Sequence, residues 1–192
     1  MSGTTLSKDS DKTFDYRGVI DRYYPEGTPL RPVYLTHCGQ VAGLALDIAR
    51  SRGLSLDRAD IEAAAMLHDI GIFACDAPSI GCHGTAPYIM HGVIGADLLR
   101  REGAPERYAR VAERHTGSGI DAAEAARLGL PAGRAYLPET ELEQLVCYAD
   151  KFFSKSGDMR RKPFDRVRES MARFGEASLA RFDLLATRFG AR

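Results

Sequence analysis

Apolar residues recur at helical spacing along most of this 192-residue chain, and no strand-like alternation interrupts them. Leu44, Ala45 and Ile48 follow Val41 by three, four and seven residues, which predicts a helix that Gly53 ends. Asp57 or Ser55 can cap the next helix. The same periodicity predicts further helices around Ile61, at 88–101, after Pro105, at 122–127 and from Pro138 onward. The pattern therefore predicts an all-α protein.

Two stretches lack this periodicity. Residues 71–87 are rich in Gly, Pro, Cys and Ser, and residues 129–138 hold two prolines, so we expect a loop and a connector. The polar start, residues 1–12, is predicted to be a disordered N-terminal segment. Residues 13–192 are long enough to bury a sizeable core and are predicted to form a single helical domain.

The last segment carries a heptad stripe of apolar residues, which predicts a C-terminal amphipathic helix. Its members are Phe164, Val167, Met171, Phe174, Phe182, Leu185 and Phe189, with Ser178 in the missing place. Gly175 weakens any single continuous helix there. The stripe fits a terminal helix laid over the core, which we favour, or the seam of a homodimer. Concentration-dependent sedimentation would separate the two.

Composition narrows the classes of protein. Lys and Arg together number 26, as do Asp and Glu, so no net charge draws the chain toward nucleic acid or a membrane. No apolar run is long enough to cross a bilayer, and the start lacks the apolar segment of a signal peptide. The four cysteines form no CxxC pair, which indicates reduced thiols and a cytoplasmic protein.

Polar side chains with metal-binding chemistry fall on the apolar faces of the predicted helices. His37, for example, precedes Val41 by four residues, and His68 follows Ile61 by seven. Burying such groups without partners costs several kcal/mol apiece. A satisfied core histidine, or an ion pair with an arginine, could explain any one of them. A shared metal centre would satisfy all six together: His37, His68, Asp69, His91, His115 and Asp150.

Four of these residues also carry a family likeness. His37, the adjacent pair His68 and Asp69, and the distant Asp150 resemble the H…HD…D signature of the HD-domain superfamily of metal-dependent phosphohydrolases. The run His-Asp-Ile-Gly at 68–71 is similar to the HDIG variant of that superfamily.

The other two histidines extend the likeness. His91 and His115 look like the two additional histidines of those members that hold two metals, and the resemblance spans about residues 34–155. The GYP motif of the cyclic-dinucleotide branch is absent, whereas dinucleoside-polyphosphate hydrolases look closer in size and ligand order.

The resemblance implies an HD-type helical bundle with a metal site at its centre. The implied ligands of the first metal are His37, His68, Asp69 and Asp150. Asp69 would bridge to a second metal, held also by His91 and His115. Such ligands suit Fe, Mn, Zn or Ni, so one or two divalent ions of open identity are expected. Members of this type use metal-activated water to cleave a phosphomonoester, phosphodiester or phosphoanhydride of a nucleotide-like small molecule.

Accessory roles follow from position. Lys151 directly follows an implied ligand and could neutralise charge on a phosphate, making it a catalytic candidate beside Asp69, or it could be an exposed lysine. Lys155, Arg160, Arg161 and Lys162 form a basic cluster that could attract an anionic substrate, although such clusters are usually solvated surface. The expected partner is a small anionic, phosphate-containing substrate, with no nucleic acid and no membrane.

Two other functions stay open. The superfamily includes diiron oxygenases with the same ligand order, and a metal-stabilised nucleotide-binding module without catalysis is also possible. His83 lies in the 71–87 loop and fits either a pocket mouth or plain surface. A zinc site built from Cys75, Cys82 and His83 matches no standard spacing and is the weaker interpretation.

Overall fold

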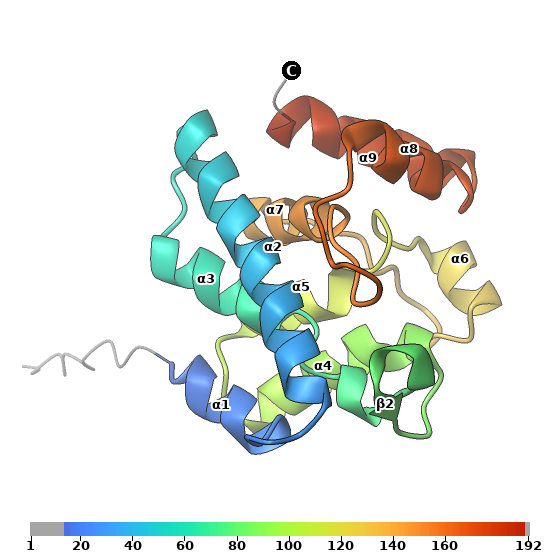
Figure 1. The fold of residues 1–192 in the computed structure, drawn as a ribbon. Helices are drawn as coiled ribbons and strands as arrows, with labels where there is room; N and C mark the ends of the chain where they lie inside the picture. Colours follow the sequence, from blue (N-terminus) through green and yellow to red (C-terminus); the bar gives the residue numbers. More distant parts are fainter. Residues whose placement is uncertain (1–13, 191–192) are drawn as a thin grey trace, which may run out of the picture.

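Helices dominate the computed structural model, which describes residues 14–190 and confirms the all-α prediction (Figure 1). The α-helices are α1 (Tyr16–Tyr23), α2 (Leu30–Arg52), α3 (Arg58–Leu67), α4 (His91–Arg101), α5 (Glu106–Arg114), α6 (Ala122–Arg127), α7 (Glu141–Asp150), α8 (Phe164–Ala172) and α9 (Glu176–Phe189). Three short 3-10 turns are η1 (Ile72–Ala74), η2 (Pro78–Ile80) and η3 (Tyr88–Met90). The predicted disordered segment, 1–12, lies outside the described residues.

The helix ends follow the local chemistry that the sequence indicates. Gly53 ends α2 in the left-handed conformation, with φ of 62°. Of the two candidate caps, Asp57 is the one used, since its carboxylate accepts from the backbone N–H groups of Ala59 and Asp60. Thr140 caps α7 in the same way. Sequence-level capping rules therefore account for the end of α2 and the starts of α3 and α7, three of the helices that carry candidate ligands.

Three features depart from the sequence predictions. Helix α1 was not predicted; it is short, and Asp15 caps it by accepting from the backbone of Gly18. The 71–87 loop contains a small antiparallel pair, in which β1 (Asp76–Ala77) faces β2 (Cys82–His83). The C-terminal amphipathic segment is two helices, α8 and α9, because Gly175, which the sequence marks as weakening a continuous helix, adopts a φ of 102° between them.

Most of the C-terminal stripe is buried within the chain. Val167, Met171, Phe182, Leu185 and Phe189 belong to the main core, and α9 packs on α7. This is the arrangement expected of terminal helices laid over the core. A homodimer stays a prediction that sedimentation would test.

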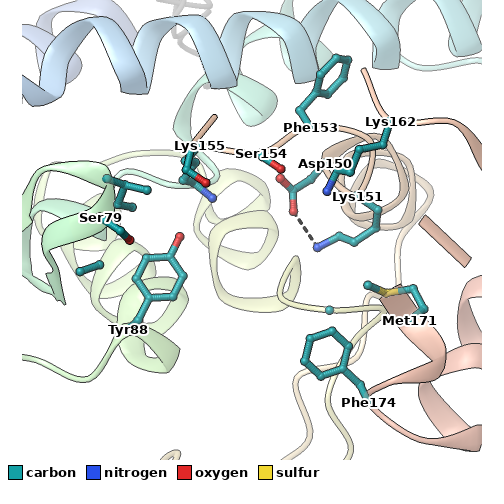
Figure 2. Close-up of a pocket in the computed structure, with 14 residues that line it drawn as sticks. Ser79, Tyr88, Asp150, Lys151, Phe153, Ser154, Lys155, Lys162, Met171 and Phe174 are labelled. Atoms are coloured by element: carbon teal, nitrogen blue, oxygen red, sulfur yellow. Dashed lines mark ion pairs between the residues drawn. The ribbon is translucent and has the colours of Figure 1, made fainter. Parts of the chain in front are cut away.

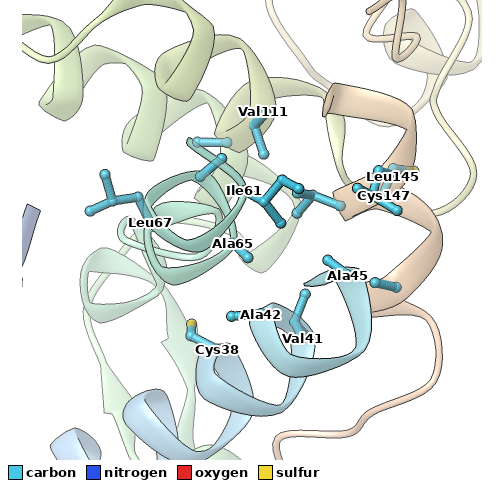
Figure 3. Close-up of a cluster of buried hydrophobic side chains, with 14 of the residues drawn as sticks. Cys38, Val41, Ala42, Ala45, Ile61, Ala65, Leu67, Val111, Leu145 and Cys147 are labelled. Atoms are coloured by element: carbon cyan, nitrogen blue, oxygen red, sulfur yellow. The ribbon is translucent and has the colours of Figure 1, made fainter. Parts of the chain in front are cut away.

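Small side chains let the central helices approach closely. Figure 3 shows Ala42 and Ala45 of α2 facing Ala65 of α3, with Ile61 at the centre and α7 alongside. All four of these side chains are at most 5% exposed. The helices α2, α3, α5 and α7 pack closely against one another. Three of them, α3, α5 and α7, have their C-terminal ends near one another.

The helix α1 supports the segment after His68. Tyr24, which follows α1, stacks on Tyr34 with ring centroids 3.9 Å apart. Its hydroxyl donates to the carbonyl oxygen of Ile70 at 3.0 Å. These contacts hold the backbone just beyond the His-Asp pair.

None of the helices within residues 14–190 has the length and hydrophobicity required to cross a membrane.

Gly71 permits a close backbone approach to α4. A Cβ atom there would lie 2.3 Å from the carbonyl oxygen of His91 and 2.5 Å from the backbone nitrogen of Gly95. We therefore expect Gly71→Ala to lower the free energy of unfolding by about 1–3 kcal/mol, the usual range for overpacking. Because the first turn of α4 must shift, His91 should lose metal affinity as well. Thermal unfolding and metal counting measure the two effects.

A second glycine provides the control. Gly43 is an exposed residue within α2, and a Cβ atom there would meet nothing within 4 Å. Gly43→Ala should leave metal content unchanged and stabilise the protein by roughly 0.5–1 kcal/mol. Equal unfolding temperatures for Gly71→Ala and the wild type would contradict the steric argument.

Candidate metal centre

The six candidate ligands meet in the interior, and four of them sit at the C-terminal ends of helices. His68 caps α3 and Asp69 follows it, His115 caps α5, and Asp150 is the last residue of α7. His37 comes from within α2, and His91 opens α4. The largest exposed fraction among the six is 8%, at Asp150. The structure thus brings together every residue that the helical faces singled out.

The first group comprises His37, His68, Asp69 and Asp150, whose donor atoms lie within 4.8 Å of one another. His37 Nε2 lies 3.1 Å from Asp69 Oδ2 and 3.0 Å from Asp150 Oδ1. His68 Nε2 lies 3.0 Å from the same Asp69 oxygen. The two Nε2 atoms are 3.3 Å apart. Two imidazoles and two carboxylates therefore face a common point.

The second group comprises Asp69, His91 and His115. The Nε2 atoms of the two histidines are 3.0 Å apart. They lie 3.6 and 3.4 Å from Asp69 Oδ1, the oxygen that the first group does not use. Each oxygen of Asp69 thus faces a different set of imidazoles, which is the arrangement that a bridging carboxylate requires.

Backbone carbonyls fix the orientation of three imidazole rings. His68 Nδ1 lies 2.6 Å from the carbonyl oxygen of Ala65, and His91 and His115 make the same i−3 contact at 2.6 and 2.8 Å. A carbonyl oxygen only accepts, so Nδ1 donates in each ring. In the neutral tautomer Nε2 then carries a lone pair, and that lone pair points at the other ligands.

This geometry fits a divalent cation. Nε2 lone pairs facing each other at 3.0 Å, as in His91 and His115, repel unless a positive charge lies between them. Oδ1 of Asp69 is buried and receives no hydrogen bond within the described residues. The C-terminal ends of α3, α5 and α7 also direct negative partial charge at the cluster. The buried cluster is therefore compatible with divalent metal.

The pKa values of His91 and His115 are those expected of metal ligands, whereas Asp69 outweighs the effect of burial and raises the pKa of His68 well above its ordinary value. Burial, followed by repulsion from His115, lowers the pKa of His91 to about 3, and burial lowers the pKa of His115 as well. Both rings are thus neutral near pH 7, as metal ligands must be. Burial alone would raise the pKa of Asp69, but His68 and Lys155 together hold it well below its ordinary value.

Two lysines lie against the cluster of candidate ligands. Lys151 Nζ lies 2.6 Å from Asp150 Oδ2 and donates to the carbonyl oxygen of His115 at 3.0 Å, so it is not an exposed lysine. For Lys155, the more common of the two interpretations of the basic cluster, solvated surface, is wrong. Its Nζ lies 2.6 Å from Asp69 Oδ2, and its side chain is 14% exposed.

A pocket of about 460 Å³ opens beside these lysines (Figure 2). The segment after α7 forms one wall, closed into a loop by the hydrogen bond from Lys162 N to the carbonyl oxygen of Phe152. Lys151, Lys155 and Lys162 contribute ammonium groups, and Asp150 joins the pocket to the cluster. Figure 2 shows Tyr88 and Phe174 entering the pocket from separate elements. The pocket is therefore cationic beside the candidate ligands and aromatic at its margins.

Other candidates from the sequence stand apart. His83 is exposed and pairs with Asp76 in the small β ladder. Cys75, Cys82 and His83 do not gather as a metal site within residues 14–190, although all four cysteines are unpaired and buried. Arg160 is a solvated residue, as expected of the basic cluster.

The fold is all-α, and its buried imidazoles and carboxylates suit a divalent ion. These two features place the chain among helical proteins with a candidate metal site. The family model for the HD domain matches residues 34–154, and the chain belongs to this family. The HDIG variant and a two-metal centre stay predictions from the residues.

The fold agrees with a solved structure. The HD domain of the Listeria monocytogenes phosphodiesterase PgpH is similar with a TM-score of 0.52, covering 90% of this chain and 96% of that one. The two sequences are 17% identical, so the likeness concerns the fold.

Sequence relatives carry other names. A tRNA (cytidine(56)-2'-O)-methyltransferase of Thermoplasma volcanium is 36% identical over 148 residues, which is 77% of this chain and 38% of that protein. An uncharacterised protein of Methanocaldococcus jannaschii is 39% identical over 117 residues, 59% of this chain and 62% of its own length. The matched region thus spans under two thirds of either relative.

Proposed function

We propose that this protein is a metal-dependent phosphohydrolase that acts on a small phosphate-containing molecule. The observation that supports this most directly is the division of Asp69 between two imidazole sets: Oδ2 faces His37 and His68, and Oδ1 faces His91 and His115. Divalent ions held there would supply an activated water and positive charge for the phosphoryl oxygens.

The chain's own residues would position these partners. The Nδ1–carbonyl hydrogen bonds of His68, His91 and His115 hold the rings rigidly, so little reorganisation is needed when ligands bind. Lys151 holds Asp150 by an ion pair. Lys155 stands where pocket and cluster meet, and its ammonium would bind a phosphoryl oxygen as negative charge develops.

The lysine-lined pocket favours hydrolysis of an anion over oxygenation. Ligand order alone leaves a diiron oxygenase open, but Lys151, Lys155 and Lys162 suit a phosphate. Activity with redox-inert zinc would support the hydrolase, whereas oxygen consumption by a mixed-valent iron pair would support the oxygenase. Tight nucleotide binding without turnover would favour the non-catalytic module.

The name of the Thermoplasma relative makes transfer RNA a substrate to test. We favour a small molecule, since the pocket holds about 460 Å³ and the chain carries no net charge to attract a polyanion. A tRNA arm in the assay, for hydrolysis and for 2'-O-methylation, would decide between these substrate classes.

The decisive experiment combines metal counting with a substrate screen. The full chain would be loaded with Mn, Fe or Zn, its metal content measured, and nucleotides, dinucleoside polyphosphates and p-nitrophenyl phosphate tested. We expect hydrolysis of at least one phosphate compound by protein with both groups occupied. Absence of hydrolysis with every metal, in fully loaded protein, would contradict the proposal.

A further inference from the structure

His37 differs from the other histidines of the candidate metal centre in the contacts of its Nδ1 atom. In His68, His91 and His115 this atom donates to the backbone carbonyl oxygen three residues earlier. His37 Nδ1 is buried and makes no hydrogen bond within the described residues. Such an atom requires an explanation, because leaving a buried polar group without a partner costs about 1–3 kcal/mol.

The place of His37 within its helix accounts for this difference. His68 and His115 lie at the C-terminal ends of α3 and α5, where the last carbonyl groups have no partner within the helix. His37 lies inside α2, where each carbonyl group accepts from an N–H group of the next turn. The Nδ1 atom of His37 therefore needs a side chain as its partner.

Gln40 offers a side chain of the right kind on the same face of α2. It follows His37 by three residues, so the two Cβ atoms are roughly 5–6 Å apart, and helical side chains lean back over the preceding turn. Gln40 Nε2 donates to the carbonyl oxygen of Met159 at 2.9 Å, which fixes which end of the amide is the oxygen. That oxygen, Oε1, is buried and makes no hydrogen bond within residues 14–190. Two neighbouring side chains of α2 thus each hold a buried atom without a partner.

The contacts of His37 Nε2 explain why these two atoms are not bonded to each other in this structure. Nε2 lies 3.1 Å from Asp69 Oδ2 and 3.0 Å from Asp150 Oδ1. Ionised carboxylate oxygens only accept, so Nε2 carries the proton. In the neutral ring Nδ1 is then an acceptor, as Gln40 Oε1 is, and two acceptors do not form a hydrogen bond.

We propose that Gln40 is a positioning residue for His37, and that its Oε1 accepts a hydrogen bond from Nδ1 when Nε2 binds a divalent cation. A neutral imidazole that is a ligand through Nε2 carries its proton on Nδ1, which makes Nδ1 a donor beside the free acceptor of Gln40. The ring releases the Nε2 proton to water and takes one at Nδ1, so its charge does not change. The new bond would fix the ring of His37 as backbone carbonyls fix the other three. This inference rests on the proposed function for the cation alone and does not depend on hydrolysis.

Zinc is the probe for this hydrogen bond, because it is redox-inert and binds imidazole and carboxylate ligands. Zinc affinity of the full chain would be measured by competition with a chelator, and the histidine rings of the zinc-loaded protein by long-range ¹⁵N–¹H NMR. In the wild type we expect a proton on Nδ1 of His37 that exchanges slowly with solvent. Gln40→Met keeps the length of the side chain without either polar atom. This variant should show fast exchange of that proton and a zinc affinity about 10- to 100-fold lower.

Two further variants make the test specific. Gln40→Glu keeps an acceptor at the same position and loses only the donor to Met159, so slow exchange of the His37 Nδ1 proton should be retained. Gln144→Met replaces the other glutamine of the chain, whose Nε2 donates to the carbonyl oxygens of Pro138 and Glu139. Gln144 contacts no candidate ligand through a hydrogen bond within residues 14–190, so this variant should match the wild type in both measurements.

The outcomes separate this inference from the proposed function. Unchanged zinc affinity or unchanged proton exchange in Gln40→Met would overturn the inference, and so would fast exchange in Gln40→Glu or equal losses in Gln144→Met. If the variants behave as expected but no phosphate compound is hydrolysed, the role of Gln40 stands and the proposed function fails. A wild type that binds no zinc would overturn both.

Discussion

Replacing Asp69 by alanine is expected to abolish metal binding at both candidate ligand groups. Its two oxygens face different imidazole pairs, so the substitution deletes a ligand from each group at once. Metal affinity should fall by more than the ~10–100-fold that follows the loss of a residue hydrogen-bonded to a metal ligand. Hydrolysis should fall to background, because no activated water would be held. Metal stoichiometry after dialysis is the primary measurement.

A ligand that belongs to one group provides the control. His91 lies only in the second group, so His91→Ala should lose one ion and retain the other, held by the first group. Circular dichroism of both variants would verify that the helices persist. Two ions retained in Asp69→Ala would contradict the bridging role, and identical losses in both variants would show that the groups do not act separately.

The helical faces made the candidate ligands predictable. His37 and His68 share an apolar stripe with core residues, and a polar group there must find a partner inside the fold. The structure places both at the core, with exposed fractions of 1% or less. A period of 3.6 residues therefore carried the information about which side chains point inward. The helical period gave no information about which of the inward-pointing groups lie close to one another.

The loop after α7 shows where sequence reasoning ends. Lys155 lies past the helix, so no periodicity assigns it a face, and neighbouring charges suggested solvated surface. The position of Lys155 depends on tertiary contacts of this loop. The backbone N–H of Lys162 donates to the carbonyl oxygen of Phe152, and Gln40 of α2 donates to the carbonyl oxygen of Met159 at 2.9 Å. These contacts join residues as many as 119 positions apart. Only the folded chain could show that the loop turns Lys155 back toward Asp69.

Helix α1 and the division at Gly175 have local causes that the pattern understated. The eight-residue α1 has only Val19 and Ile20 buried, too few apolar positions to establish a period. At Gly175 the heptad stripe continues on both sides, so periodicity favoured one helix. The backbone instead turns there, because glycine adopts a φ of 102° without steric cost.

Lys155→Met is expected to separate catalysis from metal binding. The ammonium lies 2.6 Å from Asp69 Oδ2 at the edge of the lysine pocket, where a phosphoryl oxygen would lie. Methionine keeps most of the side-chain length and apolar contact and removes only the charge. We expect kcat to fall about 10²- to 10³-fold, the usual effect of losing one group that stabilises developing charge. Metal stoichiometry should stay the same, since Lys155 is not a ligand.

The metal-free protein offers an independent measurement. Burial alone would lower the pKa of Lys155, but Asp69 raises it well above its ordinary value, so the lysine is charged and neutralises a buried carboxylate. Without this positive charge, metal-free Lys155→Met should unfold at a lower temperature than the metal-free wild type. Adding metal should remove most of that difference in unfolding temperature.

Lys162→Met is the matched control for this pair of measurements. Lys162 lines the same pocket but makes no ion pair with a candidate ligand within residues 14–190. Its loss should raise KM more than it lowers kcat, because it adds to the general attraction of the anion and does not act at the reacting phosphate. An unchanged kcat in Lys155→Met would assign that lysine a structural role. Loss of metal from Lys155→Met, with the ligands intact, would instead mean that its charge organises the cluster itself.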